Sequence, residues 1–332
     1  RRDGPTPPRC SSAEGVLDRE ATIGETPAPY SAARPDMPTL LSMSPSLAAC
    51  GLAATLIAAC GAGEACPSCG GPMRQGALAN PELLETSGIA SSRMADVLFA
   101  HNDSGDRSRF FAVSLTGADL GVFEVTGAQN IDWEDMDRGP CPAGSCLYIG
   151  DIGDNDGSRL AYTVYRMTEP TAVMAGEQDI AAERLEFTYP DGAHDAEVLL
   201  VHPVTGEVTI VTKVEDGPAQ VFVLPGELTT GKTLMATRVG EVRPPGGDSR
   251  FTGGSIHPDG AAILMRTRKS LFYYPMQPEQ RAAEALAGEP CELPVADEML
   301  GEAVTWLPGG AEFVTVGEGA SAAISLSSCA QD

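Results

Sequence analysis

The chain has 332 residues, with 22 Lys and Arg against 46 Asp and Glu, so its formal net charge is −24 at pH 7. This charge excludes an ordinary nucleic-acid-binding protein, because phosphate backbones are bound by clustered Lys and Arg, and it argues against a polybasic membrane-surface protein. Hydrophobic residues make up 42% of the chain, which is enough for a sizeable core, whereas 37 Gly and 26 Pro favour many short elements over long helices.

The N-terminal segment, residues 1–60, is expected to precede the folded domain. Residues 1–36 are Pro-rich and lack a hydrophobic period, which is typical of a disordered segment or of an extension upstream of the true start. Within residues 37–60, an apolar run over 47–59 has the length of a signal-peptide core and is too short to span a bilayer. The run ends at Cys60 in the sequence Ile-Ala-Ala-Cys, which resembles a bacterial lipobox. We therefore predict a lipoprotein signal peptide with Cys60 as the lipidated N-terminus; the alternative is a buried Ala-rich helix.

Six of the nine cysteines follow this segment, and an even number in an exported domain favours disulfide bonds. The predicted pairs are Cys141–Cys146, Cys66–Cys69 and Cys291–Cys329. The first pair would close a tight loop. The second has the spacing of a redox motif, but it lies in a Gly-rich tether without a βαβ context, so a structural bond is expected. The third would link the last two modules of the chain.

Residues 80–332 contain short β-patterned runs about 50 residues apart, a spacing that fits propeller blades. Five modules can be aligned, each with a first strand, a turn and a strongly apolar second strand. The first strands are expected at 86–91, 133–137, 196–201, 254–257 and 302–307. The fifth module ends after its third strand, so the ring needs a closing strand, and residues 73–78 in the 61–79 tether are placed to supply it. The sequence predicts an all-β propeller of five four-stranded blades, with six blades as the alternative.

Carboxylates recur at the two positions in each module that a propeller brings to one mouth of its channel: the start of the first strand and the end of the second. Six share a register at the first strands, and a seventh follows a second strand. They are Glu85, Asp132, Glu134, Asp195, Glu197, Glu302 and, after the second strand, Asp151. Carboxylates close together repel one another unless a cation neutralises them, and hard oxygen ligands suit Ca²⁺, so a calcium site is predicted. The alternative is that Asp and Asn occur in Gly-rich turns because they hydrogen-bond their own backbone.

The ends of the second strands also supply candidate residues for a ligand. The predicted substrate-binding residues are Asn102, Asp103, Asn155, Lys213 and Arg266. If the protein is an enzyme, the predicted catalytic residues are Glu134, Glu197, Lys213 and Arg266.

Five motifs, taken as a set, resemble a known family. They are His101-Asn-Asp-Ser-Gly-Asp106, Asp132-Trp-Glu-Asp135, Tyr148-Ile-Gly-Asp-Ile-Gly-Asp-Asn155, Val211-Thr-Lys213 and Gly301-Glu302-Ala303. Over about residues 83–328, the chain resembles bacterial secreted phytase-like (esterase-like) β-propeller proteins, many of which are lipoproteins. The resemblance implies a propeller, export, and Ca²⁺-dependent hydrolysis of phosphate or carboxylic esters. The chain departs from true propeller phytases in its small number of Lys, which is three.

These observations predict an exported cell-envelope lipoprotein whose acidic propeller face binds Ca²⁺ and serves as a binding or scaffold module. The alternative is a Ca²⁺-dependent ester hydrolase, in which the ion would polarise the ester and Lys213 and Arg266 would stabilise negative charge. A third reading is that Ca²⁺ only stabilises the fold, and the sequence leaves open whether the protein is an enzyme. The expected partner is a small anionic or ester ligand or an envelope component. We expect no nucleic acid, membrane contact only through the lipid anchor, and a monomer.

Overall fold

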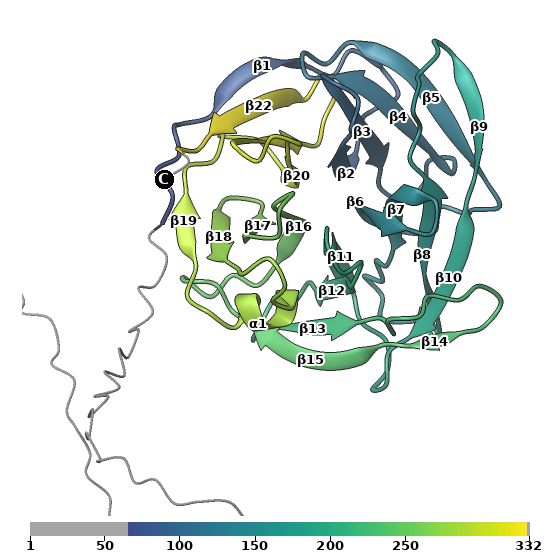
Figure 1. Cartoon of the computed structure of the whole chain (residues 1–332), viewed down its shortest axis with the longest axis vertical. Coiled ribbons are helices and arrows are strands. Elements are labelled where there is room, and N and C mark those ends of the chain that lie inside the picture. Colours follow the sequence, from purple (N-terminus) through teal and green to yellow (C-terminus); the bar gives the residue numbers. More distant parts are fainter. Residues whose placement is uncertain (1–65, 331–332) are drawn as a thin grey trace, which may run out of the picture. The chain divides into compact units, whose positions relative to one another are not determined.

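Short, mostly apolar runs separated by Gly- and Pro-containing turns form five small sheets, each packed face to face with its neighbours around a common axis (Figure 1). The computed structural model describes residues 66–330. The predicted five-bladed propeller is confirmed, and the alternative of six blades is excluded. The predicted signal peptide, residues 37–60 with Cys60, and residues 1–36 lie outside the described residues. In the described range, no helix is long and apolar enough to cross a membrane.

The first three blades each contain four antiparallel strands in which the innermost strand comes first in the chain. Blade one contains β2 (Thr86–Ser91), β3 (Val97–Asn102), β4 (Arg109–Ser114) and β5 (Asp119–Thr126). Blade two contains β6 (Trp133–Cys141), β7 (Gly144–Asp151), β8 (Tyr162–Thr168) and β10 (Glu183–Thr188). Blade three contains β11 (Ala196–Val201), β12 (Val208–Thr212), β13 (Ala219–Val223) and β15 (Thr237–Val242).

The fourth blade follows the same plan, and its third and fourth strands are joined through a short helix. It contains β16 (Phe251–Ile256), β17 (Ala262–Thr267), β18 (Leu271–Pro275) and β19 (Cys291–Leu293). The helix, α1 (Ala282–Leu286), buries Ala282, Ala285 and Leu286 at the outer side of the blade (Figure 1).

The fifth blade joins the two ends of the described chain. Its strands are β20 (Gly301–Trp306), β21 (Glu312–Gly317), β22 (Ala323–Ser328) and β1 (Met73–Ala77). The pairing of β1 with β22 is antiparallel, with Met73 opposite Leu326, and Figure 1 shows the two strands side by side. A strand from the N-terminal side therefore completes the blade, at the place where the sequence indicated a closing strand.

Two blades have five strands rather than the four predicted. The additional strands are β9 (Glu177–Ala181), which pairs in parallel with β5, and β14 (Leu234–Met235), which pairs in parallel with β10. Each belongs to the connection that leads to the last strand of the following blade, and it occupies the exposed outer edge of the preceding blade. Edge strands present unpaired N–H and C=O groups, so this pairing protects those edges and ties neighbouring blades together.

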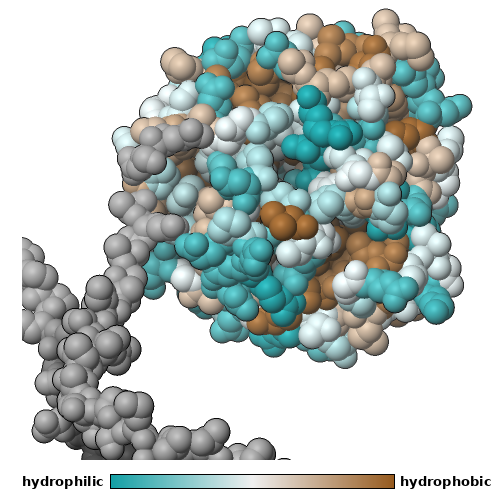
Figure 2. All heavy atoms as spheres, viewed as in Figure 1, coloured by the Kyte–Doolittle hydropathy of each residue, from teal (hydrophilic) through white to brown (hydrophobic). Residues whose placement is uncertain are grey.

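The hydrophobic core consists of five clusters, one between each pair of adjacent blades. Successive side chains of one strand face opposite neighbours: Leu98 of β3 packs toward blade five, whereas Phe99 packs toward blade two. Trp133 lies between blades one and two, and Trp306 lies between blades four and five. This two-sided burial explains why second strands such as β3 and β17 are apolar runs without clear alternation. On the face shown in Figure 2, hydrophilic residues dominate and apolar residues form separate patches.

Two of the three predicted disulfide pairs are wrong. Cys66 is bonded to Cys291, and Cys69 is bonded to Cys329; the predicted Cys66–Cys69 and Cys291–Cys329 bonds are absent among the described residues. The reason is the ring closure, because β1 runs beside β22 and brings Cys69 into a β-bridge with Cys329. The tether is thus bonded to blades four and five. The predicted Cys141–Cys146 bond at the tip of the β6–β7 hairpin is confirmed.

Candidate metal centre

A β-bulge occurs near the start of each of the five inner strands β2, β6, β11, β16 and β20. The extra residues at these bulges are, in chain order, Ser87, Glu134, Glu197, Thr252 and Glu302, and each is at most 4% exposed. A bulge leaves one residue out of the strand pairing and redirects its side chain. The repeated bulges therefore place three carboxylates and two hydroxyls at equivalent positions around one end of the ring.

The ends of the second strands meet the starts of the first strands at this same end. The backbone N–H of Asp103 donates to Glu85 O at 2.8 Å, and that of Lys213 donates to Asp195 O at 2.9 Å. The geometry expected for a propeller mouth is therefore present. We call this end, with Asp103, Asp132, Glu134, Glu197, Lys213 and Glu302, the acidic mouth.

Three carboxylates of the acidic mouth form a close group. Asp103, Asp132 and Glu134 each offer one oxygen, and these three oxygens lie within 4.8 Å of one another. Asp103 follows β3 in blade one, whereas Asp132 directly precedes β6 of blade two and Glu134 is the second residue of that strand. The sequence predicted Asp132 and Glu134 as metal ligands and assigned Asp103 to substrate binding; the structure brings all three together. We call them the three-carboxylate cluster.

Neighbouring backbone and hydroxyl groups hold the cluster in place. Ser87 Oγ donates to Glu134 O at 2.6 Å and contacts Glu134 Oε2 at 3.3 Å. The carbonyl of Asp132 accepts hydrogen bonds from the N–H groups of Ile152 and Gly153 at 3.1 and 3.2 Å. The carboxylates are therefore positioned by blade one, by β6 and by the loop after β7.

The charges of the cluster are poorly compensated by the protein. Burial, followed by the charges of Asp103 and Asp195, raises the pKa of Asp132 to about 6. Burial also raises the pKa of Asp103, and it raises that of Glu134 well above its usual range, with Asp103 and Asp132 adding to the effect. A cation among these oxygens would relieve the repulsion. An all-oxygen donor set fits a hard divalent ion such as Ca²⁺ or Mg²⁺.

Gly153 leaves the space into which two of these carboxylates extend. A Cβ atom at position 153 would overlap Glu134 Oε1 and lie 2.5 Å from Asp132 Oδ2. The Gly153 backbone does not have a positive φ, so Ala fits its conformation. The groups that would have to move are the ends of side chains, so the carboxylates would be displaced while the fold remained.

Gly153→Ala is therefore expected to weaken divalent-cation binding at least about tenfold and to change the melting temperature of the cation-free protein by less than about 2 °C. Isothermal titration calorimetry and thermal unfolding measure the two effects. Gly226→Ala is the matched control, because a Cβ at Gly226 meets no atom within 4 Å. Equal affinities in the two variants would contradict this description of the cluster.

Lys213 is a cation of the acidic mouth whose charge acts on carboxylates of three blades. Its Nζ forms an ion pair with Glu197 Oε1, and its side chain is 20% exposed. Its charge also lowers the pKa of Asp103, Glu134 and Glu302, against the larger effect of burial. Glu197 and Lys213, both predicted from the sequence, therefore lie together at the mouth.

Glu302 lies in blade five beside a cation that the sequence-based prediction missed. Arg268 Nε is 3.2 Å from Glu302 Oε1, and the Arg268 side chain is 51% exposed. Burial raises the pKa of Glu302 to about 7, with a contribution from the negative charge of Glu318. Arg268 and Glu318 follow second strands directly, so the repeat register itself was the signal for both.

Arg266, predicted to bind substrate, is enclosed in the protein. Its side chain is fully buried and forms an ion pair with Glu298, and its Nη1 donates to Ala303 O at 3.0 Å. The guanidinium joins blade four to blade five and faces no open space. This placement removes support for a catalytic or substrate-binding role of Arg266.

Asn102 and Asp151 also serve structural contacts. Asn102 is 5% exposed; its Oδ1 accepts from the N–H groups of Leu84 and Glu85, both at 3.1 Å, so it shapes the entry to β2. Asp151 is fully buried, and its Oδ1 forms a 2.9 Å ion pair with Arg159.

The remaining predicted site residues lie at the rim. Glu85 and Asn155 are exposed. Asp195 is partly buried, and its Oδ1 accepts from the N–H of Asp154 at 2.8 Å. None of these three is part of the three-carboxylate cluster.

No protein-family model and no curated protein matches the chain. Among solved structures, the chain is similar to a gluconolactonase from Xanthomonas campestris, described as important in glucose secondary metabolic pathways. The identity is 9%, the TM-score is 0.44, and the match covers 80% of this chain and 96% of that chain. At this level of similarity, we draw no functional conclusion from the match.

Proposed function

We propose that the acidic mouth binds a divalent cation and that the mouth with its cation then binds a small anionic or ester ligand. The all-oxygen donor set favours Ca²⁺ as the cation. The observation that carries this proposal is the three-carboxylate cluster, whose oxygens come from two blades and lie within 4.8 Å of one another. The space at Gly153 also supports it, because a Cβ atom there would displace the carboxylates of Glu134 and Asp132. The function proposed is that of a binding or scaffold propeller.

When bound, the ion would supply positive charge for the oxygen atoms of a ligand. The chain itself offers two cationic side chains at the same mouth, Lys213 and the half-exposed Arg268. Each is paired with a buried carboxylate of the ring, Glu197 or Glu302, so each is held in place and keeps N–H groups for an acceptor. This arrangement favours a ligand with carboxylate, phosphate or ester oxygens.

The experiment that tests the proposal is a titration of the metal-stripped protein with Ca²⁺, followed by calorimetry and thermal unfolding. Binding only to the folded state stabilises by about 2.7 kcal/mol when the ligand is at 100 times its Kd, so the melting temperature should rise by at least about 5 °C. Na⁺ at the same ionic strength is the control. Absence of heat and of any shift with Ca²⁺, Mg²⁺ and Mn²⁺ would refute the proposal.

Protons are expected to compete with Ca²⁺ in mildly acidic solution. Asp132 has a pKa raised to about 6, and a carboxyl group must be ionised to bind a cation. Affinity should therefore rise at least about tenfold from pH 5 to pH 7, and more because burial also raises the pKa of Glu134. Calorimetric titrations at fixed ionic strength measure this slope, and pH-independent affinity would contradict it.

In the ion-free protein, Asp132 should make the folded state less stable as the pH rises, whereas Ca²⁺ affinity increases with pH. Because the folded-state pKa of Asp132 lies above that of an unfolded chain, the folded state binds the extra proton between about pH 4 and 6. The contribution of Asp132 to stability therefore falls as the pH rises through that window, and an Asp132→Asn variant should lose this dependence.

The second candidate function is Ca²⁺-dependent hydrolysis of phosphate or carboxylic esters, as the phytase-like resemblance suggested. The observation that favours it is Glu302, a buried carboxyl at the mouth whose pKa of about 7 lets it hold or release a proton near neutral pH. The test is turnover of phosphomonoesters and aryl esters with Ca²⁺, compared with a Glu134→Gln, Glu197→Gln double variant. If the protein binds Ca²⁺ but its turnover rate does not exceed that of the double variant, the hydrolase function is refuted and only the binding function remains.

We also propose export and a lipid anchor at Cys60. The three disulfides support an oxidising compartment, because such bonds are rare in cytosolic proteins. Incorporation of labelled fatty acid by the wild type but not by Cys60→Ser would support the anchor, and equal labelling of both would refute it.

We propose that the protein is a monomer. Light scattering, which measures the molar mass in solution, tests this.

A further inference from the structure

A cavity of about 280 Å³ lies at the end of the ring opposite to the acidic mouth. It is formed where the inner strands end: Ser91 closes β2, Ile256 closes β16 and Trp306 closes β20. The bulges that build the acidic mouth lie near the starts of the same strands. The two sites are therefore separated by the length of the inner strands.

Arg138 lines this cavity and links blade two to blade one. It extends from β6 in blade two to blade one, where its Nε donates to Ser91 O at 3.0 Å. Within residues 66–330, neither of its terminal nitrogens has a hydrogen-bond or ion-pair partner. The guanidinium is thus fixed on one side and keeps its two terminal NH₂ groups for a ligand.

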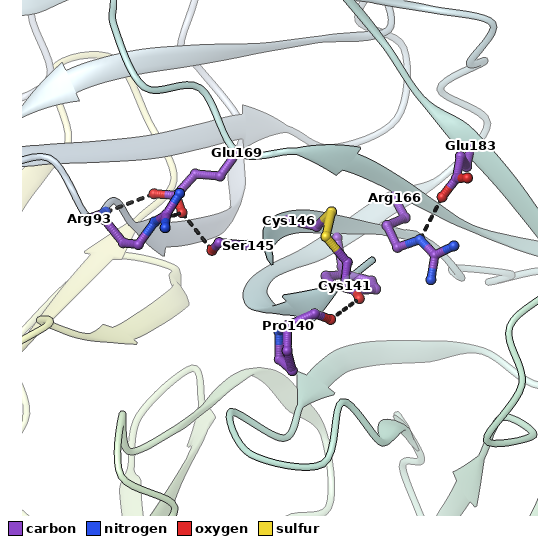
Figure 3. Close-up of a disulfide and its surroundings, with 9 residues drawn as sticks. Arg93, Pro140, Cys141, Ser145, Cys146, Arg166, Glu169 and Glu183 are labelled. Carbon is purple, nitrogen blue, oxygen red and sulfur yellow. Dashed lines mark hydrogen bonds and ion pairs between the residues drawn. A yellow bond between two sulfur atoms is a disulfide. The ribbon is translucent and has the colours of Figure 1, made fainter. Parts of the chain in front are cut away.

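Arg93 adds a second guanidinium at the rim. Its Nε lies 2.7 Å from Oε2 of the buried Glu169, while its side chain is 53% exposed. Glu169 also accepts from Ser145 Oγ at 2.7 Å, so this carboxylate fixes both neighbours, as Figure 3 shows. Because Glu169 is occupied by these contacts, it offers little to a ligand.

Asp137, a carboxyl group in the wall of the cavity, also has hydrogen-bond partners on both of its oxygens. Its Oδ2 accepts from the N–H of Val201 at 2.7 Å, and its Oδ1 accepts from that of Arg138 at 2.8 Å. Burial raises its pKa to about 7, which reduces its negative charge near neutral pH. Glu169 is ionised, since, against the effect of burial, hydrogen bonds from Arg93 and Ser145 and the charge of Arg138 lower its pKa. The two guanidinium groups together still outweigh this one carboxylate, so the cavity keeps a positive charge.

The side-chain groups left for a ligand are donors. Besides the arginines, Ser255 Oγ accepts from the N–H of Trp306 at 3.2 Å, and its own hydroxyl proton has no acceptor in the described part of the chain. A cavity that offers donors and two guanidinium groups suits a ligand rich in acceptor oxygens. Its volume limits that ligand to a small molecule.

We propose that this opposite mouth binds a small oxyanion, a molecule with a carboxylate or phosphate group, through Arg138 with Arg93 at the rim. The Cys141–Cys146 disulfide organises this site. It closes the tip of the hairpin that carries Pro140, Gly144 and Ser145 into the cavity wall (Figure 3). Holding these residues in place before binding lowers the entropic cost of association.

The experiment uses the metal-stripped protein with the substitution Glu134→Gln, so that the acidic mouth cannot bind the probes through an ion. Inorganic phosphate and succinate are titrated separately at fixed ionic strength, with calorimetry and Trp emission as readouts. Trp306 lines the cavity and should respond, whereas Trp133 is fully buried between other blades. Binding of phosphate alone identifies a phosphate site, and binding of succinate alone identifies a carboxylate site. Binding of neither probe overturns the proposal.

Arg138→Gln is expected to weaken binding of the active probe at least tenfold. Arg238→Gln is the matched control, because Arg238 is 46% exposed on the outer strand β15 and pairs with Glu241; it should change affinity less than twofold. If Arg138→Gln fails to fold, Arg93→Gln, at an exposed rim position, should still weaken binding at least threefold. Wild-type affinity in the arginine variants of the cavity would overturn the proposal. A Cys141→Ser, Cys146→Ser double variant should bind several-fold more weakly.

Discussion

Glu134→Gln is expected to reduce Ca²⁺ affinity at least about 100-fold. Glu134 is 4% exposed and belongs to the three-carboxylate cluster, so its substitution removes one full negative charge from the oxygens that would surround the ion. Loss of a group that merely orients a ligand typically costs 10- to 100-fold in affinity, and loss of a direct charged ligand should cost at least the upper value. Calorimetric titration with Ca²⁺ measures the effect.

The same substitution should stabilise the ion-free protein. The pKa of Glu134 is raised well above its usual range by burial and by the charges of Asp103 and Asp132, so ionised Glu134 destabilises the folded state when no cation is present. Glutamine keeps the shape and removes the charge. The melting temperature of Glu134→Gln should therefore exceed that of the wild type without Ca²⁺ and fall below it with Ca²⁺. A residue with a purely structural role would not produce this reversal.

Glu302→Gln is the matched comparison. Glu302 is also the bulge residue of an inner strand and is also 4% exposed, but it pairs with Arg268 and lies outside the three-carboxylate cluster. Its substitution should reduce Ca²⁺ affinity less than tenfold. Equal losses in the two variants would mean that the ion is shared around the whole ring, and wild-type affinity of Glu134→Gln would refute the metal centre.

The sequence repeats predicted the ring well because every blade packs against its two neighbours in the same way. Each inner strand is buried on both faces, and each bulge residue is the second residue of its strand, so the register of Glu134, Glu197 and Glu302 was visible without a structure. Which of these carboxylates lie together in the acidic mouth was harder to predict from the sequence. It depends on how a loop of blade one, carrying Asp103, lies against the start of β6 in blade two.

The two arginines of blade four show why a register alone does not identify a site residue. Arg266 is still paired in β17, opposite Gly253, so its side chain is directed between the blades and ends on Glu298. Arg268 follows the last residue of β17, Thr267, and its half-exposed side chain reaches Glu302 at the mouth. Arg266 and Arg268 are only two positions apart, yet the first is an enclosed structural cation and a ligand can reach the second.

The disulfide pairing could not be derived from spacing for a similar reason. Cys66 and Cys69 are near each other in the chain, but the tether runs along blades four and five, where it brings Cys66 to Cys291 and Cys69 to Cys329. A hairpin disulfide such as Cys141–Cys146 depends only on local geometry and was predictable. The long-range bonds depend on which blade the N-terminal strand completes.

Removing the Cys69–Cys329 bond is expected to cost more stability than removing the Cys141–Cys146 bond. The two residues are 260 positions apart, so the bond closes almost the whole propeller into one covalent ring, next to the pairing of β1 with β22. Because the Cys66–Cys291 bond remains, the loop that Cys69–Cys329 closes in the unfolded chain contains only about 40 residues, those between 66 and 69 and between 291 and 329, and the chain-entropy description gives about 4 kcal/mol for it. The same description gives about 2 kcal/mol for the short loop closed by Cys141–Cys146, whose sequence separation is 5.

Cys69→Ser, Cys329→Ser should therefore melt about 4–8 °C below the Cys141→Ser, Cys146→Ser variant, given about 2–4 °C per kcal/mol for a domain of this size. Both double variants lose one bond and replace the same residue types, so they form a matched pair. Hydrogen exchange should show β1 and β22 opening first in the Cys69–Cys329 variant, because the ring is otherwise held at that point only by one strand pair and the Cys66–Cys291 bond. A larger loss in the hairpin variant, or unchanged protection of β1 and β22, would show that ring closure does not limit the stability of this propeller.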